Sequence, residues 1–311
     1  MEQPTQHAGE RQPVTKKEIT ADHPTWCPGC GDFSVLSIYY KLIQKRNIPH
    51  ENVTTVAGIG CSSRFPYFVQ AHGVHYIHGR ALSFASGLSI SRPDLHVFTF
   101  GGDGDAFSIG GNHLLHVLRR NVNLNIILFN NEIYGLTKGQ YSPTSRVGTR
   151  SPSTPLGSVD SPLNPCKFAL GAGARYVART VDTNMKAMIA TLTSAHGHHG
   201  ASFVEVFQNC IVFNDGTFAD FTDKTVANDR QVIAEHGKPL VYGKEGNLAL
   251  RVKPGSFQLE AIELGDGLSV DDALVHDEKD PMLAQMLVAL RGPDVPTVVG
   301  VIYNDPVEVT Y

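Results

Sequence analysis

The sequence predicts an α/β fold in which helices cover both faces of a mostly parallel sheet, with a C-terminal extension after it. Three observations support this prediction. Helix-like and strand-like segments alternate from about residue 21 to 215, hydrophobic runs end directly in glycine or asparagine, and the periodicity weakens after 215. We therefore expect a flexible arm at 1–20, a ligand-binding domain at 21–215 and an extension at 216–311 that contacts another subunit.

The expected elements are, in order, a helix at 32–46, a strand at 52–57, a helix at 81–91, a strand at 95–100, a helix at 108–119, a strand at 124–129, a strand at 175–180, a helix at 183–196 and a strand at 201–207. The arm at 1–20 is polar and lacks periodicity. The stretch 139–165 is dense in Ser, Thr, Pro and Gly and too long for a simple connection, so we expect a lid or an interface loop there.

The composition, 41% hydrophobic and 18% charged with a formal net charge of -4, is typical of a globular protein. No apolar run approaches the length of a membrane span, and a mildly acidic chain is a poor match for nucleic acid or an anionic membrane. The five cysteines are too few and too scattered for a disulfide framework, and no apolar signal segment opens the chain. We expect a reducing, cytoplasmic location, with neither nucleic acid nor a membrane as partner.

A phosphate-binding turn is predicted where the β-branched and aromatic strand at 95–100 enters Gly102-Asp103-Gly104, before a helical pattern that runs to residue 119. Glycine lets the backbone approach an anionic ligand closely, and the unpaired amides that open a helix point at such a ligand. A dinucleotide site fits less well, because no Gly-x-Gly-x-x-Gly opens the first helix.

Oxygen donors for a magnesium ion follow two neighbouring strands. Asp103 offers a carboxylate, Asn131 an amide oxygen and Ile133 its backbone carbonyl. The carboxyl ends of parallel strands meet at one edge of a sheet, so we expect these donors close together. Gly-Asp-Gly alone is more often an ordinary turn, and Asn-Asn a helix cap, but the pair after two buried-type strands favours a site for a magnesium-bound diphosphate.

Four cysteines stand at places typical of metal ligands. Cys27 and Cys30 form a Cys-x-x-Cys motif, and Cys61 and Cys210 each follow an expected strand. Four thiolates suit either structural zinc or an iron-sulfur cluster. A redox dithiol is a third interpretation, although the surrounding pattern is not that of a thioredoxin-like unit. The fifth cysteine, Cys166, is expected to be a buried small hydrophobe.

These motifs resemble the thiamine-diphosphate enzymes, whose diphosphate-binding domain carries Gly-Asp-Gly and, further along, Asn-Asn. Four more motifs narrow the resemblance: Thr-Trp-Cys-Pro-Gly-Cys-Gly at 25–31, Gly-Ile-Gly-Cys-Ser at 58–62, His-Gly-Arg-Ala at 78–81 and Gln-Asn-Cys at 208–210. Over roughly residues 20 to 215 the chain looks like the β subunits of the 2-oxoacid:ferredoxin oxidoreductases, and the stretch 63–68 looks closest to the 2-oxoglutarate members.

The resemblance implies a thiamine-diphosphate-binding fold with thiamine diphosphate, Mg²⁺ and a 4Fe-4S cluster as cofactors, the cluster being bound by the four cysteines at 27, 30, 61 and 210. It also implies a separate α subunit that carries the pyrimidine-binding half, in an αβ or α2β2 assembly, with coenzyme A as acyl acceptor and ferredoxin as electron acceptor. The residues that it assigns to cofactor binding are Gly60, Ser62, His78, Gly102, Asp103, Gly104, Asp105, Asn131, Ile133, Gly135 and Leu136.

Two residues are candidates for a direct part in the reaction. His78 is expected to reach the diphosphate or the reacting centre, the alternative being a satisfied, partly buried histidine. Lys138 would pair with a second carboxylate and so favour 2-oxoglutarate over pyruvate, the alternative being a solvated surface lysine. Arg64 is a weaker candidate for the same contact.

The expected function is reversible, CoA-dependent oxidative decarboxylation of 2-oxoglutarate to succinyl-CoA and CO2, with electrons passed through the cluster to ferredoxin. One alternative is pyruvate or a broad set of 2-oxoacids as substrate. Another is a non-redox thiamine decarboxylase or synthase in which the cysteines hold structural zinc. A non-catalytic protein of the same fold is disfavoured, because it would lose the magnesium donors first, and Asp103 and Asn131 are both present.

Overall fold

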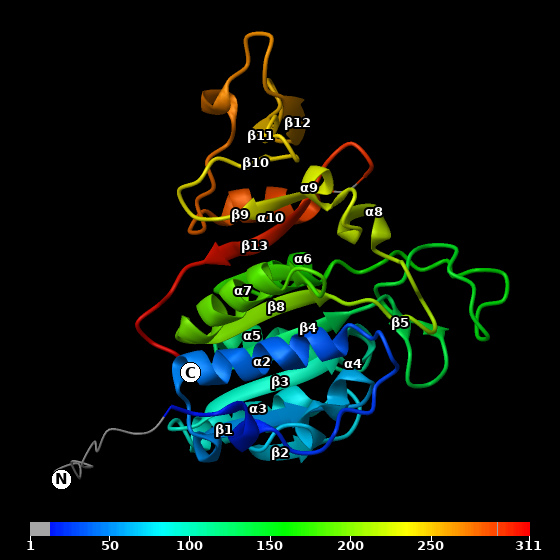
Figure 1. The fold of residues 1–311 in the computed structure, drawn as a ribbon, viewed down its shortest axis with the longest axis vertical. Helices are drawn as coiled ribbons and strands as arrows, with labels where there is room; N and C mark the ends of the chain where they lie inside the picture. Colours follow the sequence, from blue (N-terminus) through cyan, green and yellow to red (C-terminus); the bar gives the residue numbers. More distant parts are fainter. Residues whose placement is uncertain (1–12, 291) are drawn as a thin grey trace.

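A computed structural model describes residues 13–290 and 292–311 of the chain. Within these residues an eight-stranded sheet runs in the order β2-β1-β3-β4-β8-β7-β13-β9, and Figure 1 follows it from β2 at the bottom to β9. All neighbouring strands pair in parallel except β13 with β7, so the mostly parallel sheet that the sequence predicts is confirmed. Its strands are β1 (Val53–Ala57), β2 (His72–His75), β3 (His96–Gly102), β4 (Leu124–Asn130), β7 (Tyr176–Val181), β8 (Ala201–Phe207), β9 (Gln231–Ala234) and β13 (Thr297–Asn304).

Helices connect the parallel strands, as crossover connections require. Those of the described residues are α1 (Lys16–Ile19), α2 (Asp32–Arg46), α3 (Ala81–Ser91), α4 (Asp103–Phe107), α5 (Gly111–Arg120), α6 (Pro165–Gly171), α7 (Met185–Gly197), α8 (Ala219–Thr222), α9 (Ala227–Arg230) and α10 (Pro281–Ala289), with short 3₁₀ turns at His50–Asn52, Ser62–Tyr67 and Val270–Asp272. None of these helices is long and apolar enough to cross a membrane.

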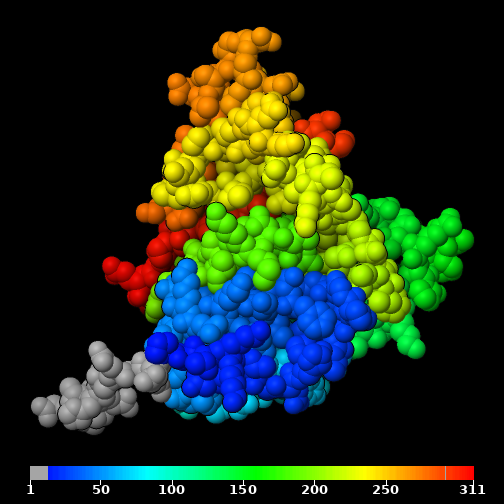
Figure 2. All heavy atoms as spheres, viewed as in Figure 1, coloured from blue at the N-terminus to red at the C-terminus, as the bar shows by residue number. Residues whose placement is uncertain are grey.

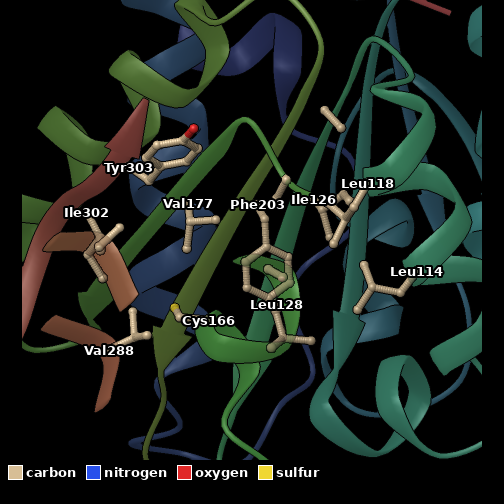
Figure 3. Packing of buried hydrophobic residues seen from close by; sticks show 14 of the residues in the cluster. Leu114, Leu118, Ile126, Leu128, Cys166, Val177, Phe203, Val288, Ile302 and Tyr303 are labelled. Carbon is tan, nitrogen blue, oxygen red and sulfur yellow. The ribbon is translucent and has the colours of Figure 1, made fainter. Parts of the chain in front are cut away.

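Two hydrophobic clusters lie on the two faces of the sheet, because successive strand residues point to opposite sides. On one face, Phe98, Phe100 and Phe129 pack with residues of α2 and α7. On the other, Ile126 and Leu128 of β4 pack with α3, α5, α6 and α10. Figure 3 shows this second cluster, in which Leu114 and Leu118 of α5 face β4, and Phe203 and Val177 continue it across β8 and β7. Because both faces of the sheet are buried, each central strand is a nearly continuous run of apolar residues in the sequence.

One helix of the prediction differs from the structure. A separate short helix, α4, precedes the predicted helix at 108–119. Residues 108–110 are not helical, and α5 begins at Gly111. Gly110 makes this break possible, because a Cβ there would lie 2.4 Å from the carbonyl oxygen of Asp105. Gly79 approaches the same bend with φ +69°, and a Cβ on it would lie 2.4 Å from Ile109. The interruption between α4 and α5 therefore lets the loop that carries Gly79 pack closely against residues 109–110.

The two ends of the chain contain more regular structure than the sequence pattern suggests. Of the expected arm at 1–20, residues 1–12 lie outside the described residues, whereas Thr15 and Glu18 form a capping box on α1 and Ile19 is buried. In the expected extension at 216–311, β9 and β13 complete the sheet, and β10 (Val241–Tyr242), β11 (Leu248–Val252) and β12 (Leu259–Glu263) form a small antiparallel sheet at the top of Figure 1. Their short strands carry too few residues to give a periodic signal.

The Ser/Thr/Pro/Gly-rich stretch at 139–165 projects from one side of the molecule, as the green segment in Figure 2 shows. Its first residues belong to the hairpin of β5 (Ile133–Tyr134) and β6 (Gln140–Tyr141). Leu156 is 96% exposed near its outer end, whereas Ser142, Thr144 and Ser145 near its start are buried. The segment thus has an anchored base and an exposed outer part.

Candidate functional site

A cavity of about 270 Å³ opens at the carboxyl edge of the sheet, where β1, β3 and β4 end. It is lined by Ile59, Gly60, Cys61, Ser62, His78, Gly102, Asp103, Gly104, Asp105, Asn131, Ile133, Tyr134, Gly135, Leu136 and Thr137. This lining contains every residue that the sequence analysis assigns to cofactor binding. The structure therefore brings these predicted residues together, although they come from loops far apart in the chain.

Asp103, the predicted magnesium carboxylate, is the first residue of α4 and only 2% exposed. Its Oδ2 accepts hydrogen bonds from the hydroxyls of Ser142 and Thr144, both at 2.5 Å. The Thr144 hydroxyl also lies 3.0 Å from Asn130 Oδ1. Burial raises the pKa of Asp103 to about 6, against the opposing effect of these hydroxyl donors. The base of the 139–165 stretch thus holds the carboxylate in place.

Asn131, the predicted amide ligand, follows β4, and a hydrogen bond at each end of its side-chain amide fixes its orientation. Its Nδ2 donates to Gln208 Oε1 at 2.8 Å, and its Oδ1 accepts from the backbone N–H of Ile133 at 3.2 Å. Glu132 between them adopts φ +56°, which turns the chain sharply at this point. One carboxylate, one amide oxygen and one carbonyl are hard oxygen donors, so the donor chemistry at this edge fits Mg²⁺ with a diphosphate.

Asp105 organises the loops around the cavity. Its Oδ1 accepts hydrogen bonds from the backbone N–H groups of Ile59 at 3.0 Å and Gly79 at 2.8 Å, and it lies 2.7 Å from Nδ1 of His78. A Cβ on Gly58 would lie 2.1 Å from Asp105 Oδ2, so only glycine permits this approach. With Nδ1 of His78 held by the carboxylate, Nε2 is the ring nitrogen left for a ligand.

Three loops that carry cysteines are tied to one another. Trp26 Nε1 donates to the carbonyl of Cys61 at 2.7 Å, and the N–H of Gly31 donates to the carbonyl of Asn209 at 3.4 Å. The segments around Cys27 and Cys30, Cys61 and Cys210 therefore converge. A Cβ on Gly135 would lie 3.4 Å from Sγ of Cys210 and 3.7 Å from Sγ of Cys61, which places these two sulfurs beside the same glycine.

The surroundings of the converging cysteines disfavour their ionised, thiolate forms. The pKa of Cys61 is raised to about 12, first by burial and then by Asp32, Cys210 and Cys27. The pKa of Cys30 is also raised, first by burial and then by Asp32, Cys61 and Cys210. Thiols in such an environment stay protonated on their own and lose their protons when a metal cation binds them. The donor set fits a thiolate-bound metal centre, with Gly135 leaving room beside two of the sulfurs.

Among the described residues, no group of three or more His, Cys, Asp or Glu side chains has the arrangement of a preformed metal site. The four cysteines at 27, 30, 61 and 210 therefore do not form such a group here, and the inferred magnesium donors include one side chain of these types, Asp103. The cysteines differ from one another in exposure: Cys27 is exposed, whereas Cys30, Cys61 and Cys210 are half-buried. Cys166 is fully buried on α6, as expected, and its Sγ lies 3.2 Å from Glu205 Oε2.

The two candidates for substrate contact lie outside the cavity lining. Lys138 is exposed, with φ +75°, in the turn between β5 and β6, one residue beyond Thr137 at the cavity wall. Arg64 donates to the carbonyl of Thr25 at 3.1 Å and lies 5.9 Å from the ring centre of Phe68. Arg64 is therefore engaged by neighbouring residues, whereas Lys138 stands at the rim.

Sequence reasoning missed a supporting network behind the magnesium donors. Glu205 is fully buried on β8, where its Oε1 accepts from Asn130 Nδ2 at 2.8 Å and its Oε2 accepts from Arg179 Nε at 2.8 Å. Asn130 in turn faces Thr144, the donor to Asp103. A charged residue in the middle of an apolar strand was the available signal for Glu205, but nothing local to Ser142 or Thr144 indicates their partner.

Comparison with known proteins agrees with this geometry. The family model described as thiamine pyrophosphate enzyme, C-terminal TPP binding domain, matches residues 58–206. The 2-oxoglutarate oxidoreductase subunit KorB of Mycobacterium tuberculosis is 47% identical over 294 residues, which is 93% of this chain and 78% of that protein. The 2-oxoacid:ferredoxin oxidoreductase subunit beta of Saccharolobus solfataricus is 41% identical over 65% of this chain and 67% of its own length.

A solved structure supports the same relationship. The 2-oxoglutarate:ferredoxin oxidoreductase from Magnetococcus marinus, with 2-oxoglutarate, coenzyme A and succinyl-CoA bound, superimposes with a TM-score of 0.75 at 33% identity, covering 97% of this chain and 88% of that chain. Both the thiamine-diphosphate-binding fold and the family resemblance read from the sequence are thereby confirmed. This chain belongs to the family of the β subunits of 2-oxoacid:ferredoxin oxidoreductases.

Proposed function

We propose that this chain is the β subunit of an enzyme that converts 2-oxoglutarate and coenzyme A reversibly into succinyl-CoA and CO2, with two electrons passed singly through a 4Fe-4S cluster to ferredoxin. The observation that carries the proposal is the shared wall of one cavity, in which Asp103 and Asn131 lie with Cys61. A diphosphate site and a thiolate site in contact with the same cavity suit a cofactor whose adduct is oxidised by the cluster.

Asp103, Asn131 and the carbonyl of Ile133 would hold Mg²⁺, and the loops at Gly60 and Gly102 would face the diphosphate. Thiamine diphosphate, when bound, supplies the carbanion nucleophile and the electron sink for decarboxylation. The chain's own contribution is orientation. Asp105 accepts a hydrogen bond from Nδ1 of His78, so Nε2 of the neutral ring is left at the cavity wall as an acceptor of a proton or a hydrogen bond.

The four cysteines at 27, 30, 61 and 210 would bind the cluster. Iron would stabilise their thiolates and so offset the burial, and the neighbouring negative charges, that raise the pKa of Cys61. The competing assignment is structural zinc in a thiamine enzyme that transfers no electrons. Thiolate ligands of either metal require a reducing environment, so a cytoplasmic location is part of the proposal.

The choice of 2-oxoglutarate rests on the names of the relatives and on Lys138 at the cavity rim. A cation there would pair with the second carboxylate of a dicarboxylic substrate, which pyruvate lacks. A partner α subunit would complete the cavity in an αβ or α2β2 assembly. Ile59, Ile77 and Leu136, which are exposed apolar residues at or beside the mouth, are suited to being covered by it.

The proposal is tested by an anaerobic visible spectrum and a metal analysis of the chain purified with its native partner. A brown, iron-containing complex that bleaches on addition of 2-oxoglutarate and coenzyme A is the expected result. A colourless complex with zinc would contradict electron transfer. Bleaching with pyruvate but not with 2-oxoglutarate would keep the family and overturn the substrate.

A further inference from the structure

Gln208 lies between the two predicted cofactor sites. It is the first residue after β8 and only 1% exposed, and its backbone N–H continues the ladder to β4 by donating to the carbonyl of Asn130 at 2.9 Å. Its side chain therefore starts at the same sheet edge as Asn131. The Gln-Asn-Cys motif at 208–210 supports the sequence resemblance through its cysteine, but the glutamine has no assigned role there.

The side-chain amide of Gln208 contacts one predicted ligand of each site. Its Oε1 accepts from Nδ2 of Asn131 at 2.8 Å, and its Nε2 donates to Sγ of Cys30 at 3.3 Å and to the carbonyl of Asn209 at 2.5 Å. One buried amide thus joins a predicted magnesium ligand to a predicted cluster ligand. No water is needed to complete this connection.

The polarity of the two amides sets their orientation. An amide has one acceptor oxygen and one donor nitrogen, so the pair Asn131 and Gln208 can meet only as donor and acceptor. Because Nδ2 of Asn131 donates to Gln208, Oδ1 of Asn131 points the other way, toward the N–H of Ile133 and the cavity. With Oε1 of Gln208 committed to Asn131, its Nε2 must face Cys30. Reversal of one amide would bring two like groups together.

The close approach of the cysteine loop to Gln208 depends on Gly31. A Cβ at this position would lie 2.8 Å from Cγ of Gln208 and 2.0 Å from Oδ2 of Asp182. The N–H of Asn209 donates to the same Asp182 oxygen at 2.8 Å, which fixes the chain on the other side of Gln208. The amide is therefore confined by backbone and side chains rather than free to rotate into solvent.

We propose that Gln208 is a positioning residue for both cofactors: its carbonyl oxygen turns the oxygen of Asn131 toward magnesium, and its N–H stabilises the Cys30 thiolate of the cluster. This inference rests on the proposed function. Outer hydrogen bonds that orient a metal ligand commonly matter to metal affinity. Hydrogen bonds to the sulfurs of an iron-sulfur cluster are among the determinants of its reduction potential, because they stabilise the more negative, reduced state.

Two substitutions separate the two halves of this role. Gln208→Leu removes both the acceptor for Asn131 and the donor to Cys30. Gln208→Glu keeps an oxygen that accepts from Asn131 but places a second oxygen, and a negative charge, toward Cys30. Gln231→Leu is the matched control, because Gln231 on β9 also donates its side-chain amide to a backbone carbonyl, that of Phe221 at 2.6 Å, at the far edge of the sheet.

The measurements are made on the complete complex with its partner subunit. The midpoint potential of the cluster is obtained from a redox titration followed by electron paramagnetic resonance, and the Mg²⁺-dependent affinity for thiamine diphosphate by calorimetry. Gln208→Leu is expected to make the potential more negative and to weaken cofactor affinity by roughly 10-fold to 100-fold. Gln208→Glu is expected to make the potential more negative with cofactor affinity near wild type. Gln231→Leu should change neither quantity.

The inference fails if Gln208→Leu retains its iron with an unchanged potential and an unchanged cofactor affinity. If Gln208→Leu loses iron altogether, Gln208→Glu decides: an iron-loaded complex with a wild-type potential would overturn the role at Cys30. A wild-type complex without iron contradicts the proposed function itself, whereas an iron-loaded wild type with unaltered variants contradicts only the role of Gln208.

Discussion

Asp105 shows how one carboxylate can support a site through backbone donors. Its single oxygen Oδ1 gathers two backbone N–H groups and the ring of His78, which come from two different loops. Those loops supply much of the cavity wall. The residue was predicted to bind cofactor, and the structure places it on the lining with its carboxylate directed at the protein rather than left free for a ligand.

Replacing Asp105 with alanine leaves the amides of Ile59 and Gly79 without their acceptor. We expect Asp105→Ala to lower the free energy of unfolding by about 1–3 kcal/mol, which urea denaturation of the chain would measure. Asp94→Ala is the control, because Asp94 is exposed and pairs with Arg92 within its own turn; its effect on the free energy of unfolding should be much smaller than that of Asp105→Ala. Equal effects of the two substitutions would contradict the supporting role of Asp105.

His196 gives the fold a sensitivity to acid at the edge opposite the cavity. Its Nε2 lies 3.0 Å from Nδ1 of His96, and its ring stacks on Phe98. The pKa of His196 is lowered to about 4, first by burial and then by the neighbouring His96 and Arg46. In the unfolded chain the His196 ring takes up a proton as the pH falls below about 6.5, whereas in the folded chain it stays neutral down to about pH 4. The free energy of unfolding therefore decreases as the pH drops from about 6.5 to 4.

The expected loss across that pH range is up to roughly 3 kcal/mol, and His196→Gln should remove most of it. Urea unfolding at several pH values between 4 and 7 would measure the slope of stability against pH. His199→Gln provides the control, because His199 is exposed just beyond the end of α7, the helix that carries His196. A slope unchanged by His196→Gln would show that the pair is not responsible.

At the scale of elements, the base of the 139–165 stretch acts as a clamp on the predicted magnesium site. Thr144 is buried and its hydroxyl bonds to Asp103 and Asn130, which stand at the ends of β3 and β4. Behind it, Glu205 and Arg179 hold Asn130 from β8 and β7. A polar chain across four neighbouring elements therefore fixes one carboxylate.

Thr144→Val keeps the shape of the side chain and removes its hydroxyl. We expect it to weaken Mg²⁺-dependent binding of thiamine diphosphate by roughly 10-fold to 100-fold, as the loss of an outer support of a metal ligand commonly does. Calorimetric titration of the complete complex would measure the affinity. Thr149→Val tests specificity, because the Thr149 hydroxyl donates within its own turn, to the carbonyl of Arg146. An affinity unaltered by Thr144→Val would contradict the clamp.

The elements that the sequence predicts well are those with a strong local signal. Helices α2 and α3 occur at the expected bounds, and β3 and β4 end at the glycine and asparagine motifs. The break between α4 and α5 was not expected, because it depends on the packing of Gly79 against Gly110. Contacts such as Thr144 with Asp103 join residues 41 positions apart, and no local pattern encodes them.

At the scale of the whole molecule, exposed apolar side chains lie around the mouth of the cavity. Ile77 is 66% exposed one residue before His78, and Ile59 and Leu136 are exposed on the lining. The sequence predicts one copy of the diphosphate-binding core in this chain and a pyrimidine-binding half elsewhere. The site residues remain predictions, whereas the fold and the family membership that they imply are confirmed.

Ile77→Asp places a charge in the surface that we expect the partner subunit to cover. Burying an unpaired carboxylate is costly, so the substitution should weaken assembly by on the order of 10-fold or more while the chain stays folded. Size-exclusion chromatography with light scattering would measure assembly, and circular dichroism the fold. Phe257→Asp is the control: Phe257 is 95% exposed in the turn between β11 and β12, away from the cavity. Unchanged assembly of Ile77→Asp would move the interface elsewhere.

The predicted ligands of both metals stand at or near the ends of helices and strands. None is a buried member of either hydrophobic cluster, although Cys30 and Cys61 pack against one of them. Asp103 and Asn131 follow β3 and β4, while the cysteines stand before α2 and after β1 and β8. Mutations that alter cofactor content therefore fall largely outside the residues that determine folding. During evolution the metal sites could therefore be gained, lost or altered by changes at these segment ends, while the hydrophobic clusters that stabilise the fold stay the same.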